Sequence, residues 1–85
     1  MAKPIRQSAH AARYAQSRGF RPDEVEQAIR QAPWTPAREG RMECQLDFPY
    51  NAQWNGRLFA TKRVRPIFVE EPEEIVVVTV VTYYF

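Results

Sequence analysis

The sequence contains very few of the residues from which most catalytic centres are built. Its 85 residues include one cysteine, Cys44, one histidine, His10, and only three glycines. A single cysteine excludes an internal disulfide and any metal site with several cysteine ligands. One histidine with scattered acids cannot form a paired metal site or a Ser/His/Asp set, and no glycine-rich phosphate loop is present. Nucleotide-dependent and metal-dependent chemistry are therefore not expected, and no cofactor is predicted.

The chain also lacks a long hydrophobic run and a strong excess of charge of one sign. Its valine-rich tail spans about ten residues, which is too short to cross a bilayer, and no apolar run follows Lys3 and Arg6 near the amino terminus. These features predict a cytoplasmic, soluble protein with no membrane partner. The 12 Lys and Arg residues against 10 Asp and Glu residues give a net charge of +2, which permits a polyanionic partner without requiring one.

What is present predicts one packed domain over residues 1–85, with residues 1–7 flexible. A 45% share of hydrophobic residues, with 13% aromatic, is typical of a globular chain. The basic and acidic residues are unevenly distributed. The acids gather at residues 23–26 and 70–74, whereas the middle of the chain carries a basic set comprising Arg38, Arg41, Arg57, Lys62, Arg63 and Arg65. One basic face is therefore possible.

Two helices are predicted in the first third of the chain. Ser8 can cap a helix that ends at Gly19, a residue suited to the left-handed turn that terminates helices. A second helix follows in RPDEVEQAIRQA, where Pro22 suits the first helical position and Val25, Ala28 and Ile29 form one apolar stripe. Residues 33–40 are predicted to be a loop that Trp34 fastens to the core.

The remaining chain predicts a sheet. From Met42 to Phe48 apolar and polar residues alternate, which indicates a strand with one buried face. RLFATKRVRPIFVE predicts one long strand, or two short strands broken near Pro66, and EPEE predicts a turn. IVVVTVVTYYF is apolar on both faces and is expected in the middle of the sheet. The predicted fold class is α+β, with two N-terminal helices packed on a three- or four-stranded antiparallel sheet.

His10 and Arg13 lie three residues apart, on the same side of the first predicted helix. Arg13 would bind a phosphate oxygen while His10, whose unperturbed pKa is about 6.5, exchanges a proton with a reacting hydroxyl. Packing of His10 against Tyr14 is the alternative.

The basic run 62–65 predicts a second cationic group. Side chains alternate along a strand, so Arg63 and Arg65 point to one face and Lys62 to the other. Two arginines on one face suit phosphate binding. The alternative is a solvated face on which the cations pair with the acids Glu70, Glu71, Glu73 or Glu74.

Aromatic residues end the chain and flank a predicted hairpin. Tyr83 and Phe85 share one face of the last strand, whereas Tyr84 takes the other, and either tyrosine could stack on an RNA base. Core or edge packing is the alternative. Asn55-Gly56 resembles a hairpin tip, where Trp54 either serves a partner or folds back onto the sheet.

Several motifs give the chain a family resemblance. His10-x-x-Arg13, Arg18-Gly19, DEVEQAI and the tail KRVRPIFVEE followed by IVVVTV resemble a small bacterial family described only as a domain of unknown function, over residues 8–85. That family is similar to the BrnT and RelE/ParE toxins. The resemblance implies a RelE/BrnT-like fold and a toxin of a type II toxin–antitoxin pair, acting as a metal-independent endoribonuclease and silenced by a small antitoxin protein. His10, Arg13 and Lys62 match positions of the family pattern.

Two functions are therefore predicted. In the first, the protein is a toxin-like endoribonuclease in which a 2′-hydroxyl attacks the adjacent phosphate. His10 is then the acid or base, Arg13 and Lys62 complete the catalytic set, and RNA is bound by Arg63, Arg65, Tyr83 and Tyr84. In the second, the protein is a non-enzymatic module that docks a partner protein through its sheet edge or basic face. A sheet edge would also allow a homodimer by strand addition.

Overall fold

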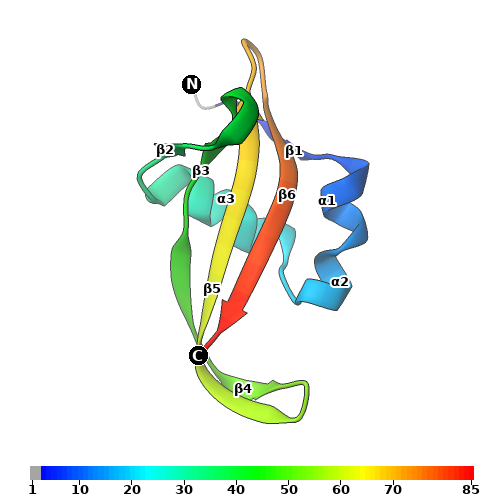
Figure 1. Cartoon of the computed structure of the whole chain (residues 1–85), viewed down its shortest axis with the longest axis vertical. Helices are drawn as coiled ribbons and strands as arrows, with labels where there is room; N and C mark the ends of the chain where they lie inside the picture. The colour runs from blue at the N-terminus through cyan, green and yellow to red at the C-terminus, as the bar shows by residue number, and fades with distance from the viewer. Residues whose placement is uncertain (1–2) are drawn as a thin grey trace.

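The computed structural model describes residues 3–85 and shows an α+β fold (Figure 1). The chain forms strand β1 (Ile5–Gln7), helices α1 (Ala9–Arg13), α2 (Ala15–Arg18) and α3 (Pro22–Gln31), and strand β2 (Thr35–Pro36). After a single 3-10 turn, η1 (Arg38–Gly40), come strands β3 (Met42–Glu43), β4 (Leu46–Trp54), β5 (Arg57–Glu70) and β6 (Ile75–Tyr84). The predicted α+β class is therefore confirmed.

The sheet differs from the predicted one in size and direction. It has six strands in the order β1-β6-β5-β3-β2, and β4 also pairs with β5. β3 pairs with the second half of β5, at Ile67 and Phe68, and β4 pairs with the first half, from Arg57 to Val64. The β4, β5 and β6 pairings are antiparallel, as predicted, but β1 pairs with β6 in parallel, with Ile5 opposite Ile75. β1 and β2 were not predicted, because strands of three and two residues are too short for a period of two to be visible in the sequence. The strand predicted over residues 42–48 is divided into β3 and the first part of β4.

The N-terminal segment belongs to the sheet from Ile5 onward. A flexible segment over residues 1–7 was expected, and residues 1–2 lie outside the described part of the chain. The backbone of Ile75 donates to the Pro4 carbonyl at 2.9 Å, and Ser8 donates to the Val77 carbonyl at 2.9 Å. β1 is thereby fixed along β6.

The predicted helix caps and the predicted start of α3 are observed at Ser8, Gly19 and Pro22. Ser8 caps α1 by accepting the Ala11 amide at 3.1 Å, and Gly19 ends α2 with a φ of 77°. The first helix is not continuous, because Tyr14 leaves the helical region (φ −95°, ψ 2°) and divides it into α1 and α2. Pro22 begins α3 as predicted.

The two sheet faces have different surroundings. α3 covers one face, where Val64 and Phe68 of β5 and Val77 of β6 pack against Val25 and other apolar residues of the helix. α1 and α2 lie along the β6 side, and no α-helix formed by residues 3–85 covers the opposite face (Figure 1). We call this second surface the open face.

β5 is one strand and continues through Pro66. Pro66 is fully buried and pairs with Val80, beside a register shift between Ile67 and Phe68. Proline has no backbone N–H to donate to the neighbouring strand, and a bulge next to it is where such a missing hydrogen bond is accommodated. β6 lies between β5 and β1, so its predicted interior position is confirmed.

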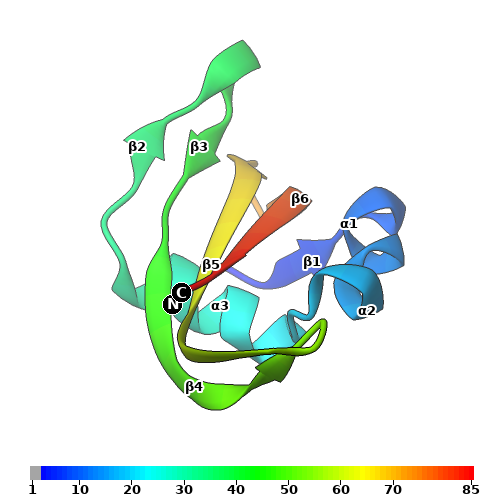
Figure 2. The same ribbon diagram turned by 60° about the horizontal axis from the view of Figure 1, so that its bottom comes forward.

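The β4–β5 hairpin curves around the end of the molecule toward α2 (Figure 2). A register shift between Pro49 and Ala52 bends β4, and Asn55 and Gly56 form the predicted tip with positive φ values. The molecule is elongated, with extents of 42 × 24 × 24 Å.

Candidate functional site

The predicted catalytic helix is exposed on the β6 side of the molecule. His10 and Arg13 both lie on the surface of α1. The His10 ring contacts Tyr14 edge-on, with ring centroids 5.0 Å apart, as the packing alternative predicted.

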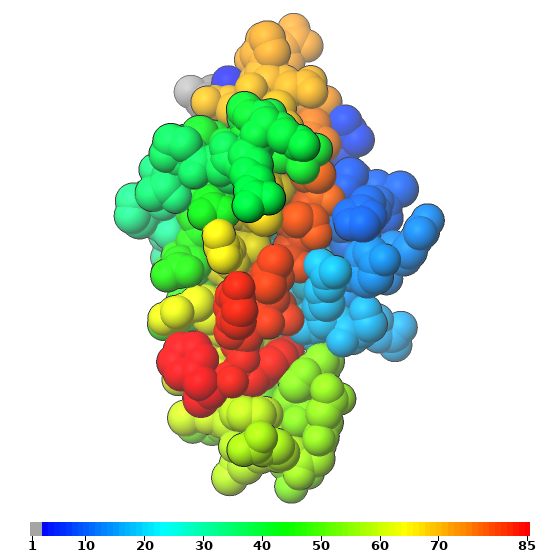
Figure 3. Space-filling view, in the orientation of Figure 1, coloured from blue at the N-terminus to red at the C-terminus, as the bar shows by residue number. Residues whose placement is uncertain are grey.

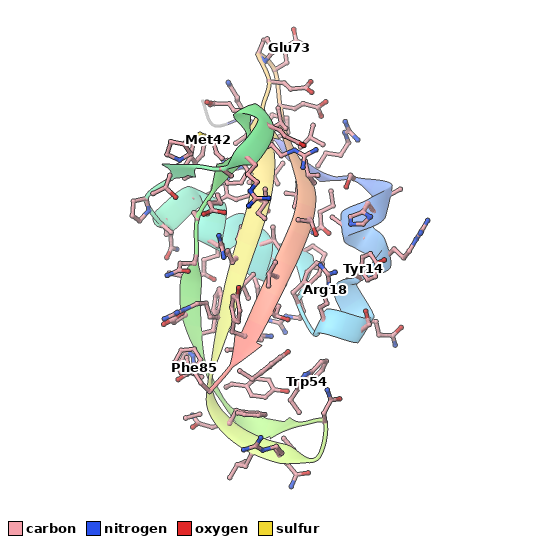
Figure 4. The ribbon with its side chains drawn as sticks, viewed as in Figure 1. Tyr14, Arg18, Met42, Trp54, Glu73 and Phe85 are labelled. Atoms are coloured by element: carbon pink, nitrogen blue, oxygen red, sulfur yellow. The ribbon has the colours of Figure 1, made fainter. Side chains whose placement is uncertain are left out.

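Arg18 fixes these helices to β6. Its guanidinium lies 4.3 Å from the centre of the Tyr14 ring and donates to the Val80 carbonyl at 2.7 Å and to Thr79 Oγ1 at 3.2 Å (Figure 4). Arg18 therefore satisfies backbone and hydroxyl acceptors of β6 at a point where β1 has ended.

Lys62 is a buried cation of the helix-covered face. Its ammonium group donates to Glu24 Oε1 at 2.9 Å and to the Gly19 carbonyl at 3.1 Å, and it lies 2.7 Å from Glu24 Oε2. Both side chains of this pair are less than one-tenth exposed. Glu24 Oε1 also accepts the Arg21 amide at 2.9 Å, so the pair joins β5 to the start of α3.

The structure does not bring His10 and Lys62 together. Ser8, which begins α1, bonds to Val77, whereas Lys62 is opposite Tyr84, seven residues further along β6. At about 3.3 Å per strand residue, the start of α1 at Ser8 is roughly 20 Å from Lys62 along β6. Lys62 is enclosed by Glu24 and the Gly19 carbonyl, whereas His10 is exposed and contacts Tyr14. Proton transfer requires hydrogen-bond reach, so these two groups do not form one recess.

Arg63 and Arg65 point to the open face, as the alternation predicted. Arg63 donates to both carboxylate oxygens of Asp47, at 2.7 and 3.0 Å, and Arg65 donates to Glu43 Oε2 at 2.7 Å. The bond from Arg63 holds the pKa of Asp47 below its usual value. The acids that pair with these arginines therefore belong to β3 and β4, and not to the turn at residues 70–74.

The two arginines also contact exposed aromatic residues. The Arg63 guanidinium lies 5.0 Å from the centre of the Phe85 ring, and Arg65 donates to the Tyr83 hydroxyl at 3.5 Å. Tyr83 is 43% exposed and Phe85 is 53% exposed, and both are among the large apolar side chains most open to solvent. The C-terminal residues are visible on this side of the space-filling view (Figure 3).

Tyr84 faces the helix-covered side and has a packing role. It stacks on Trp54 with ring centroids 4.8 Å apart, and its hydroxyl donates to the carbonyls of Arg18 and Gly19 at 3.2 and 3.4 Å. Burial raises the pKa of this hydroxyl to about 12. Trp54 thus folds back, one of its two predicted alternatives, and the structure separates Tyr84 from Tyr83.

Sequence reasoning did not identify a hollow that adjoins the arginines of the open face. It has a volume of about 550 Å³ and lies between the turn containing η1 and strands β5 and β6. Arg38 and Arg41 line it from the turn, and Arg65, Glu43 and Thr79 line it from the sheet. The alternation through residues 42–48 was the one feature of the sequence that pointed to this surface, because it places Glu43 and Asp47 on the same face of a strand.

The described residues, 3–85, hold no group of three or more His, Cys, Asp or Glu side chains that could bind a metal ion. Cys44 is buried, and its thiol donates to the Ala28 carbonyl at 3.4 Å. Burial raises the pKa of this thiol to about 11.

No protein-family model matches the sequence, and no significant match was found among curated proteins or solved structures. Over residues 3–85, none of the helices has the length and apolar character needed to cross a membrane.

Proposed function

We propose that this protein is a non-catalytic binding module that docks a partner protein through the open face of its sheet. One observation carries the proposal. Arg63 and Arg65 are each held by a cross-strand carboxylate at 2.7 Å, with the exposed rings of Tyr83 and Phe85 beside them. The face therefore combines aromatic surface with guanidinium groups whose charges are already compensated.

The composition of this face favours a protein partner over RNA. Arginine, tyrosine and phenylalanine are enriched in protein interfaces, and arginine and tyrosine are frequent among the residues that dominate binding energy. Binding to a phosphate backbone instead depends on uncompensated cations that displace counterions. Here Asp47 and Glu43 lie where an RNA phosphate would approach Arg63 and Arg65, and would repel it.

The face is favoured over the edge of the sheet. The outermost long strand, β4, contains Pro49 and a register shift. Proline and bulges are features that prevent strands from adding to an edge. We therefore place the partner on the open face and not along β4.

The product of the adjacent gene is the first partner to test. We expect a stoichiometric complex by size-exclusion chromatography with light scattering, and calorimetry should show that Tyr83→Ala weakens it by about tenfold or more. Leu58→Ala is the matched control. Leu58 is 74% exposed, but it lies on the β4–β5 hairpin and away from the open face, so its loss should change affinity less than twofold, a margin of roughly 0.4 kcal/mol.

Equal losses for Tyr83→Ala and Leu58→Ala would place the partner elsewhere and contradict the proposal. So would a purified chain that cleaves RNA with a dependence on His10.

A second candidate is the metal-independent endoribonuclease, with a small antitoxin as its partner. It is supported by the exposure of His10 and Arg13 on α1, which leaves both free to meet a substrate. The order of α1, α2 and α3 before the antiparallel strands β4, β5 and β6 also supports a RelE/BrnT-like arrangement. In this case Arg13 alone would supply the cation near His10.

This candidate has a direct test. His10→Ala should abolish both RNA cleavage and any growth arrest on expression, without changing the melting temperature, because His10 is exposed. Gln16→Ala, an exposed change on α2, is the control. Intact RNA after incubation with the unmodified chain would exclude it.

A further inference from the structure

The hollow beside the open face has two unlike walls. The turn between β2 and β3 supplies Arg38 and Arg41, and the sheet supplies Arg65, Glu43 and the apolar side chain of Ile67. In the space-filling view this turn stands in front of β5 and β6 (Figure 3). The volume of about 550 Å³ lies within the usual range of binding sites.

The hollow has an excess of positive charge. Three guanidinium groups line it, against the single carboxylate of Glu43, which Arg65 already binds at 2.7 Å. Arg41 has only a distant partner, Glu39, at 3.6 Å, and Arg38 forms no salt bridge within residues 3–85. Two guanidinium groups are therefore available to a ligand.

The turn holds these two groups on a defined backbone. The Arg41 amide donates to the Arg38 carbonyl at 3.2 Å, and the Ala37 amide donates to the Arg41 carbonyl at 2.8 Å. Glu39 and Gly40 both have positive φ values, of 61° and 72°. Preorganised donors lose less entropy on binding than mobile ones.

Thr79 adds a neutral donor opposite the turn. Its hydroxyl oxygen accepts from Arg18 at 3.2 Å, which leaves the hydroxyl proton free for a ligand oxygen. Arg18 thereby connects the hollow to the helices on the β6 side.

We propose that this hollow binds the side-chain carboxylate of an acidic segment in the partner protein, with Arg38 and Arg41 as its main donors. The inference rests on the proposed function and names the chemistry of the partner. Guanidinium groups bind carboxylates through two parallel hydrogen bonds, and Ile67 would contact the methylene groups of a glutamate. The exposed rings of Tyr83 and Phe85 on the adjoining open face favour a protein as the source of this carboxylate, and RNA is tested as the other anionic ligand.

The test uses the full chain labelled with ¹⁵N and three probes: a short glutamate-rich peptide, the same peptide with glutamine in place of glutamate, and single-stranded RNA. The glutamate peptide should shift the amide and Nε signals of Arg38 and Arg41, and the glutamine peptide should not. Arg38→Ala and Arg41→Ala should each weaken binding about tenfold, as expected for a lost hydrogen bond between charged groups. Arg57→Ala, which removes the same charge from the β4–β5 hairpin, should leave binding within about twofold, or roughly 0.4 kcal/mol.

Four results would overturn the inference. A similar loss in Arg57→Ala would indicate non-specific charge attraction, and the absence of any shift at Arg38 and Arg41 would show that the hollow does not bind carboxylates. RNA shifting these signals more strongly than the peptide would assign the hollow to phosphate. If Tyr83 governs binding of the natural partner while Arg38→Ala and Arg41→Ala do not, this inference fails and the proposed function stands.

Discussion

Lys62 and Arg63 are neighbours in the sequence but lie on opposite faces of β5, and their environments differ accordingly. Lys62 is enclosed with Glu24 beneath α3, whereas Arg63 pairs with Asp47 at the surface. Exposed pairs stabilise a protein by only about 0.2 to 1 kcal/mol. Removal of one partner from a buried pair costs about 3 to 5 kcal/mol, because it leaves an uncompensated charge.

We therefore predict that Lys62→Met lowers the free energy of unfolding by about 3 to 5 kcal/mol, measured by urea denaturation. The double variant Lys62→Met with Glu24→Gln should recover part of this loss, since glutamine is neutral and can still accept the Arg21 amide. Arg63→Met is the exposed comparison and should cost about 1 kcal/mol or less. A loss of only about 1 kcal/mol in Lys62→Met, as expected for an exposed pair, would show that Lys62 is not held in the buried pair.

At the scale of elements, the turn from α2 to α3 is the point where the hairpin meets the helices. Gly19 has a φ of 77°, and a Cβ atom there would collide with the Tyr84 hydroxyl and lie 2.7 Å from the Trp54 ring. The carbonyls of Arg18 and Gly19 also accept from Tyr84, and the Gly19 carbonyl accepts from Lys62. The absence of a side chain at Gly19 thus allows Tyr84 of β6 and Trp54 of the β4–β5 hairpin to approach the end of α2.

We predict that Gly19→Ala destabilises the protein by more than Gly56→Ala does. Both glycines have nearly the same φ, 77° and 80°, but a Cβ atom at Gly56 would meet nothing within 4 Å. The backbone strain, about 1 kcal/mol, is therefore common to both variants, and the difference in their urea midpoints measures the contact with Trp54 and Tyr84. Equal losses would mean that the hairpin does not pack on the turn.

At the scale of the whole molecule, stability should decrease at high pH. In the folded protein the pKa of Cys44 is raised from 9.0 to about 11 and that of Tyr84 from 10.0 to about 12, both mainly by burial. Since the folded state holds these protons more tightly than the unfolded state, their contribution is complete below pH 9 and is lost as pH rises toward 12. Circular dichroism during urea unfolding at several pH values will measure it. Tyr84→Phe should flatten the dependence above pH 10, and an unchanged slope would contradict the assignment.

Low pH should also destabilise the fold, for the opposite reason. The pKa values of Asp47 and Glu74 lie below their usual 3.8 and 4.5, because Arg63 and Arg6 donate hydrogen bonds to them. Their contribution is therefore present above these values and is lost as pH falls through the folded-state pKa values. The protein should be most stable between these two limits.

The features that could be predicted are those that depend on residues close together in the sequence. Alternation placed Lys62 and Arg63 on different faces and separated Tyr84 from Tyr83, and the caps at Ser8 and Gly19 were visible as residue types. The pairing partners were not predictable in this way. Asp47 and Glu43 reach Arg63 and Arg65 through the register of strands that are 16 and 22 residues distant in sequence, and residue type alone does not fix a register.

The parallel pairing of β1 with β6 has a consequence for how the chain folds. Ser8 bonds to Val78 across 70 positions in the sequence, so β1 can dock only after β6 has been synthesised. Contacts of such long sequence separation slow folding, because the entropy of closing the loop is lost before the contacts form. The hairpin of β5 and β6 can nucleate by itself. Pairing of β1 with β6 should then be a late step in folding.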